Sequence, residues 1–174
     1  MRLQSAIFTL GDTLFTPDGA AREGLDKALS LFKMEGVWLG AVTALSAEDA
    51  QKALEKAGLN SYFRFVLTES VALCKADSGT MFERAMKRLH SQKDDTIVFS
   101  SSLAAIQNAK DAGFRTVRCR EVRARRTGRR CSNSPRRALR STANCWKILC
   151  EFWNNDRIRR FLVAVFLNCD IVRI

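Results

Sequence analysis

Short apolar segments alternate with longer amphipathic segments through the first 120 of the 174 residues. The apolar segments are flanked by polar residues, and each is short enough to be a strand; they are 4–10, 37–43, 63–67, 96–100 and 114–118. This alternation is typical of right-handed crossover units around a parallel sheet. It therefore predicts an α/β fold in which about five parallel strands carry helices on both faces.

The segments between the strands carry helix signals. Ser46 with Asp49 forms a capping box, and Gly58 stands where that helix should end. Ser102 and Gly113 bracket a second helix. We expect the inward faces to contain Ala50, Leu54 and Ala57; Leu103, Ile106 and Ala109; Met81, Phe82, Ala85, Met86 and Leu89; and Leu25, Ala28, Leu29 and Phe32. With these helices the fold class becomes a three-layer, Rossmann-like domain over residues 1–120.

The net charge of +11 is distributed very unevenly. Residues 1–120 hold 16 basic and 14 acidic residues, whereas residues 121–174 hold 13 basic and 4 acidic ones. The stretch 122–140 is rich in arginine and has neither helical nor strand periodicity. We expect 121–174 to be a basic, Arg- and Cys-rich extension that is poorly ordered or loosely packed. An out-of-frame or decayed extension would show the same abrupt change in composition.

The six cysteines have no repeated C-x-x-C spacing, and His90, expected on the outer part of a helix, is the single histidine. Neither a zinc site nor a disulfide framework is expected. The apolar run after Met1 is too short for a signal peptide or a membrane span. These observations predict a cytoplasmic protein with no membrane partner.

Four segments carry polar residues at or just beyond expected strand ends, in a fixed order along the chain. They read FTLGDTL at 8–14, LGAVT at 39–43, CKAD at 74–77 and IVFSSSL at 97–103. Their order and spacing resemble those of the haloacid dehalogenase superfamily of aspartate-nucleophile phosphatases and relatives. The resemblance covers residues 1–120.

The resemblance implies a defined chemistry at these strand ends. One aspartate attacks a phosphoryl group, and a second carboxylate two positions later transfers the proton. A magnesium ion held by carboxylates neutralises phosphate charge, while a hydroxyl and a lysine bind the remaining oxygens. By position, Thr43 and Lys75 match the phosphate-binding hydroxyl and lysine.

The remaining matched positions lack the carboxylates that this chemistry requires. Thr9 stands at the nucleophile position and Gly11 at the acid–base position, whereas Ser100 and Ser101 replace the acidic pair that anchors the metal. No cofactor is therefore expected, and magnesium only if activity is retained. The sequence predicts an inactive pseudoenzyme with residual binding of a phosphate-bearing ligand.

Asp12 supports an alternative interpretation. Gly11-Asp12 reverses the family's Asp-Gly order, and a one-residue bulge would bring the Asp12 carboxylate into the site as a substitute nucleophile. The chain would then be a phosphatase with weak or unusual magnesium-dependent activity. Asp12 as a solvated turn residue, Thr43 as the start of a turn and Lys75 as an exposed loop residue are the simpler interpretations.

Two further features bear on partners. Only 34 positions separate Thr9 from Thr43, which leaves room for one helix but none for an inserted cap domain, so the crevice should be open to water. The arginines of 123–140 would bind nucleic acid phosphates nonspecifically, with a steep dependence on salt. The sequence sets no substrate and no oligomeric state.

Overall fold

The computed structural model describes residues 3–119, which contain one five-stranded parallel sheet. The strands are β1 (Ser5–Thr9), β2 (Trp38–Thr43), β3 (Phe65–Thr68), β4 (Thr96–Ser100) and β5 (Arg115–Arg118). Their order across the sheet is β3-β2-β1-β4-β5, and every adjacent pair is parallel. The predicted strand number, positions and direction are confirmed.

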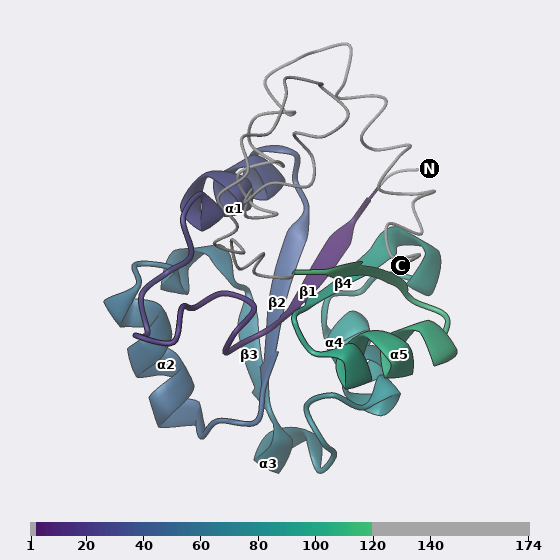
Figure 1. Ribbon diagram of the computed structural model, residues 1–174. Coiled ribbons are helices and arrows are strands. Elements are labelled where there is room, and N and C mark those ends of the chain that lie inside the picture. Colours follow the sequence, from purple (N-terminus) through teal and green to yellow (C-terminus); the bar gives the residue numbers. More distant parts are fainter. Residues whose placement is uncertain (1–2, 120–174) are drawn as a thin grey trace, which may run out of the picture.

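Helices connect the strands and form two outer layers. They are α1 (Leu25–Met34), α2 (Ala47–Lys56), α3 (Glu69–Ala72), α4 (Gly79–Arg88) and α5 (Leu103–Asp111), with the short 3-10 helices η1 (Asn60–Tyr62) and η2 (Lys93–Asp95). Figure 1 shows α1 and α2 on one side of the sheet and α4 and α5 on the other. The predicted three-layer α/β architecture is confirmed.

Hydroxyl side chains define where α2, α3, α4 and α5 begin, whereas α1 follows Gly24 without a side-chain cap. The Ser46 side chain accepts a hydrogen bond from the Asp49 backbone N–H, as the capping-box pattern predicts. Ser102 caps α5 in the same way through the Ala105 N–H. Gly58 and Gly113, just beyond α2 and α5, have φ angles of +69° and +83°. Both glycines thus end their helices in the left-handed conformation that favours glycine.

A hydrophobic core lies on each face of the sheet. On one side Phe8 stacks against Phe99, with ring centroids 4.7 Å apart, and the apolar stripe of α1 packs over both rings. On the other side, α4 and α5 pack over Ile7, Val42 and Val98. The α1 stripe is fully buried as expected, and the α4 stripe is buried except for Met86, which is partly exposed.

Two details of the helix prediction are wrong. Leu103 is 61% exposed, and Ala105 takes the inward position together with Ile106 and Ala109. As the first residue of α5, Leu103 precedes the turn that packs on the sheet. His90 lies beyond the C-cap of α4, in an exposed turn with a φ angle of +53°, and so is not on the helix itself.

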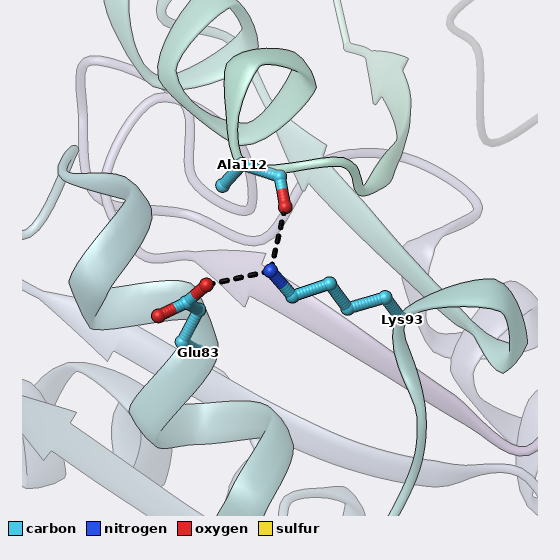
Figure 2. Close-up of polar contacts among 3 residues, drawn as sticks. All are labelled: Glu83, Lys93 and Ala112. Atoms are coloured by element: carbon cyan, nitrogen blue, oxygen red, sulfur yellow. Dashed lines mark hydrogen bonds and ion pairs between the residues drawn. The ribbon is translucent and has the colours of Figure 1, made fainter.

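Lys93 of η2 contacts both α4 and the end of α5. Its ammonium group lies 2.6 Å from the Glu83 carboxylate on α4 and 2.9 Å from the carbonyl oxygen of Ala112 at the end of α5 (Figure 2). This short ion pair lowers the pKa of Glu83, chiefly through the hydrogen bond from Lys93 and then through its charge. The contact fixes η2 against both helices just before β4 begins.

The predictions for the basic extension lie outside the described residues. These are its order, its nucleic-acid contacts and its origin. Within 3–119, none of the helices has the length and apolarity that a membrane crossing requires. Cys74 and Cys119 form no disulfide with each other within residues 3–119.

Candidate functional site

Four of the five strands of the sheet end in a hydroxyl residue. Thr9, Thr43, Thr68 and Ser100 close β1, β2, β3 and β4, and the last three are almost completely buried. Because the strands are parallel, these residues share the carboxyl edge of the sheet, where ligands of open α/β sheets bind. The predicted strand-end residues Thr9, Thr43 and Ser100 are therefore brought to one edge.

Four of the hydroxyls at this edge form a connected cluster: Thr9, Thr13, Ser100 and Ser101. The Thr9 hydroxyl donates to Ser100 Oγ over 2.9 Å and lies 2.8 Å from the Thr13 hydroxyl. Thr13 in turn donates to Ser101 Oγ over 3.2 Å and accepts from the Ser101 backbone N–H over 2.9 Å. The hydroxyl cluster thus fastens the end of β1 to the end of β4 without a charged group.

Thr13 is the member of the hydroxyl cluster that the sequence analysis left without a role. It is completely buried, and its side chain bonds both to Thr9 and to the segment after β4. The sequence contains a signal for this role, because Thr13 is a small hydroxyl residue four positions after Thr9 and directly follows Gly11-Asp12. A residue there is well placed to cross-link the loop to the neighbouring strand.

The turn after β1 determines where Asp12 lies. Gly11 has a φ angle of +94°, and its carbonyl oxygen accepts from the backbone N–H groups of Leu14 and Phe15. Asp12 is exposed, and Arg22 bonds to its backbone carbonyl oxygen over 2.9 Å. Within the described residues its carboxylate forms no hydrogen bond or ion pair.

Thr43 and Lys75 stand in different settings. Thr43 is 3% exposed, and its Oγ1 accepts from the Leu45 backbone N–H over 3.0 Å, as at the start of a turn. Lys75 is exposed in the loop between α3 and α4. Among residues 3–119 no hydrogen bond joins these two side chains. Their joint binding of phosphate stays a prediction.

Glu69 is a second residue that the sequence analysis did not single out. It begins α3, and its carboxylate accepts from the Ala76 backbone N–H over 2.6 Å. The Glu69 side chain thereby holds the loop that carries Lys75 against the end of β3. Because this carboxylate already accepts a hydrogen bond from the loop backbone, we assign it a structural role in the loop rather than a role in ligand binding.

The donor atoms at the edge are hydroxyls rather than carboxylates. No group of three or more His, Cys, Asp or Glu side chains suited to a metal ion occurs within residues 3–119. The Ser100 hydroxyl accepts from Thr9 and from the Ser102 backbone N–H. Such neutral, mutually bonded oxygens are weak ligands for a hard dication such as Mg²⁺.

The sequence profile of the haloacid dehalogenase-like hydrolases matches residues 14–119. The chain belongs to this haloacid dehalogenase-like family. The match begins at Leu14, two residues after Asp12. No curated protein matches the chain.

Solved structures of haloacid dehalogenase-like proteins share the fold. A proposed β-phosphoglucomutase of Thermotoga maritima superposes with a TM-score of 0.64 at 12% identity, covering 87% of this chain and 98% of that one. The L-2-haloacid dehalogenase of Xanthobacter autotrophicus gives 0.62 at 10% identity, with 70% and 79% covered. The core domain of a proposed phosphoglycolate phosphatase of Streptococcus pneumoniae gives 0.56 at 16% identity, with 80% and 95% covered. At these identities the likeness establishes the haloacid dehalogenase-like fold alone.

Proposed function

We propose that this haloacid dehalogenase-like protein is catalytically inactive and that its carboxyl edge retains only anion binding. The observation that carries the proposal is the hydroxyl cluster, in which Thr9 is bonded to Ser100 and Thr13. A threonine hydroxyl needs a general base before it can attack phosphorus. The single histidine, His90, follows α4 in an exposed turn, and the partners of Thr9 are other hydroxyls.

Magnesium does not fit the residues present. Its family positions are occupied by Thr9, Gly11, Ser100 and Ser101, which supply hydroxyl oxygens and no carboxylate. Mg²⁺ sheds its hydration shell only for strong, usually charged, oxygen ligands. We therefore assign no catalytic step to a metal ion in this protein.

Anion binding draws on what the edge does contain. The Lys75 ammonium is exposed, Thr43 offers a hydroxyl, and the first turn of α5 directs backbone N–H groups toward the end of β4. A phosphate-bearing ligand would meet these donors without meeting a carboxylate that could accept the phosphoryl group. Phosphate binding should therefore weaken in Lys75→Ala, whereas Lys52→Ala, a change at an exposed lysine of α2, should leave it unchanged.

The alternative function is a phosphatase that uses Asp12. Its support is that the Asp12 carboxylate is exposed, unpaired among the described residues and only three positions beyond Thr9. Such an enzyme should lose its activity with EDTA and in Asp12→Asn. Nonspecific nucleic-acid binding by residues 121–174 is a further proposal, and it predicts affinity that falls steeply between low and moderate salt.

The deciding experiment compares hydrolysis of p-nitrophenyl phosphate with magnesium by the parent and by a restored variant. The restored variant carries Thr9→Asp, Gly11→Asp, Asp12→Gly and Ser101→Asp. Gly11 has a positive φ angle that suits aspartate poorly. The variant therefore includes Asp12→Gly, so that the neighbouring position can adopt the positive φ angle of the turn instead. A silent parent with an active variant supports the proposal, and EDTA-sensitive turnover by the parent overturns it.

A further inference from the structure

We infer that the amino edge of the sheet carries a docking surface for an acidic protein segment with an apolar anchor residue. This edge is opposite the hydroxyl cluster, because all five strands run in the same direction. Met34 ends α1, Trp38 begins β2 and Tyr62 ends η1 just before β3. The docking surface is formed by the two segments 30–38 and 61–64.

Two cations on this surface stack on aromatic rings. The Arg64 guanidinium lies 4.3 Å from the centre of the Trp38 ring, and the Lys33 ammonium lies 5.7 Å from the centre of the Tyr62 ring. Neither cation forms an ion pair within residues 3–119. The only side-chain hydrogen bond of Lys33 among these residues is donated to the carbonyl oxygen of Ser61 over 3.4 Å. Both positive charges are therefore positioned by their rings and available to a carboxylate.

An open pocket of about 400 Å³ lies between the same two segments. It is lined by Ser30, Lys33, Met34, Ser61 and Tyr62. The Ser30 hydroxyl and the Tyr62 hydroxyl lie 2.9 Å apart, which joins α1 to η1 across the pocket. The pocket is open to solvent, so a side chain of another molecule can enter it.

The pocket and the Arg64–Trp38 pair are close neighbours. Arg64 is two residues from Tyr62, so their Cα atoms are at most about 7 Å apart. Met34 is 78% exposed and Trp38 is 52% exposed. Exposed tryptophan, tyrosine, arginine and methionine are the residue types enriched where protein interfaces bind most strongly. The flexible Met34 side chain can adapt to an apolar anchor that enters the pocket.

The charges on this surface favour an acidic partner. Segments 30–38 and 61–64 together hold Lys33, Arg64 and a single carboxylate, that of the partly buried Glu35. Nucleic acid fits less well, because Arg64 already stacks on the Trp38 ring and two cations are too few to follow a phosphate backbone. A protein segment that combines acidic residues with one large apolar side chain matches both the cations and the pocket.

The test uses the full chain and short fluorescent peptides at moderate salt, with binding followed by anisotropy. One pool contains acidic peptides with a central Phe, Leu, Trp or Met; the others are acidic peptides with a central Ala, basic peptides with the same anchors, and single-stranded oligo-dT. Lys33→Ala/Arg64→Ala is compared with Lys52→Ala/Lys87→Ala, which removes two exposed lysines from α2 and α4. Both double variants keep the basic extension, so its attraction for acidic peptides is common to them.

We expect the anchored acidic pool to bind best and to lose at least about tenfold in affinity in Lys33→Ala/Arg64→Ala. The control double variant should stay within about twofold of the parent, since equal charge is removed elsewhere. All four side chains are exposed, so equal unfolding temperatures will show that both variants fold. Absence of binding by the anchored acidic pool, equal losses in the two double variants, or a larger loss of oligo-dT than of peptide would each overturn the inference.

Discussion

Thr9 donates a hydrogen bond to Ser100 across 2.9 Å, although the two residues are 91 positions apart in the chain. The bond joins the ends of two neighbouring central strands. Neutral hydroxyls can lie this close without a cation between them, whereas two carboxylates at the same separation would repel each other. We therefore expect the carboxyl edge to need no bound ion for its stability.

The first prediction concerns the ion dependence of stability. Thr9→Asp/Ser100→Asp should unfold at a lower temperature than the parent in EDTA, because it places two like charges where hydroxyls lie 2.9 Å apart. Added Mg²⁺ should recover roughly 1 to 3 kcal/mol if it binds the new site, while leaving the parent unchanged. Thermal unfolding with and without Mg²⁺ measures both effects. Stabilisation of the parent by Mg²⁺ would contradict the proposed neutral site.

The second prediction tests the cross-link made by Thr13. Thr13→Val keeps the shape of the side chain but leaves the Ser101 backbone N–H without its acceptor. We expect a loss of about 1 to 3 kcal/mol in the free energy of unfolding, measured in urea. Thr13→Ser retains the hydroxyl and should lose much less. Equal losses in the two variants would show that the methyl group matters as much as the hydroxyl.

The third prediction tests the orientation of α5. Ile106→Ala should cost about 2 to 4 kcal/mol because Ile106 is buried, with only 7% of its surface exposed. Leu103→Ala should change the free energy of unfolding by less than about 0.5 kcal/mol, since Leu103 is 61% exposed at the start of α5. Urea denaturation of the two variants measures the difference. A large loss in Leu103→Ala would mean that this side chain is buried.

The fourth prediction is a dependence of stability on pH through Glu83. Because Lys93 lowers the pKa of Glu83 in the folded state, folding favours the ionised carboxylate. This contribution is present above the unfolded pKa of the group and is lost as the pH falls through the folded pKa. In Glu83→Gln the unfolding temperature should therefore fall less steeply than in the parent as the pH is lowered through the acidic range.

A control isolates this effect from general acid unfolding. Asp18 is exposed in the loop after β1, and its side chain forms no hydrogen bond within residues 3–119. Asp18→Asn should keep the pH profile of the parent. Parent-like acid sensitivity in Glu83→Gln would show that the ion pair drawn in Figure 2 does not govern the profile.

The fifth prediction concerns the close approach at Gly40. A Cβ atom on this residue of β2 would lie 2.9 Å from Cζ of Phe65 on the neighbouring strand. Gly40→Ala should therefore cost about 1 to 3 kcal/mol through overpacking. The smaller side chain of Phe65→Leu should recover part of that loss in the double variant. Additive losses in a double-mutant cycle would rule out the contact as the cause.

Local signals explain how much of the fold the sequence predicts. The capping hydroxyls Ser46 and Ser102 and the glycines Gly58 and Gly113 act within one turn of the chain, so their effect is visible in the sequence. The order of the strands depends on contacts between distant segments, and the alternating pattern does not specify it. The predicted burial of Leu103 is wrong because the apolar pattern of α5 fits an inward face that contains either Leu103 or Ala105 in the first turn.

The site shows the same division between local and distant information. Thr9, Thr43 and Ser100 were expected at strand ends, and parallel strands must bring their ends to one edge. The hydroxyl cluster was not foreseen, since Thr13 and Ser101 meet only after β1 and β4 have paired. The roles of Lys75 and Asp12 stay predictions, because exposed side chains are not fixed by packing.

The central position of β1 has a consequence for synthesis of the chain. β1 pairs with β2 early, but its other neighbour, β4, ends at Ser100, which is 57 residues after the end of β2 at Thr43. At ordinary translation rates the side of β1 that pairs with β4 stays unpaired for about 3 to 11 s. During that time the central strand of the finished sheet is an open edge that can pair with another chain. The ribosome-bound half of this protein is therefore the species most in need of a chaperone.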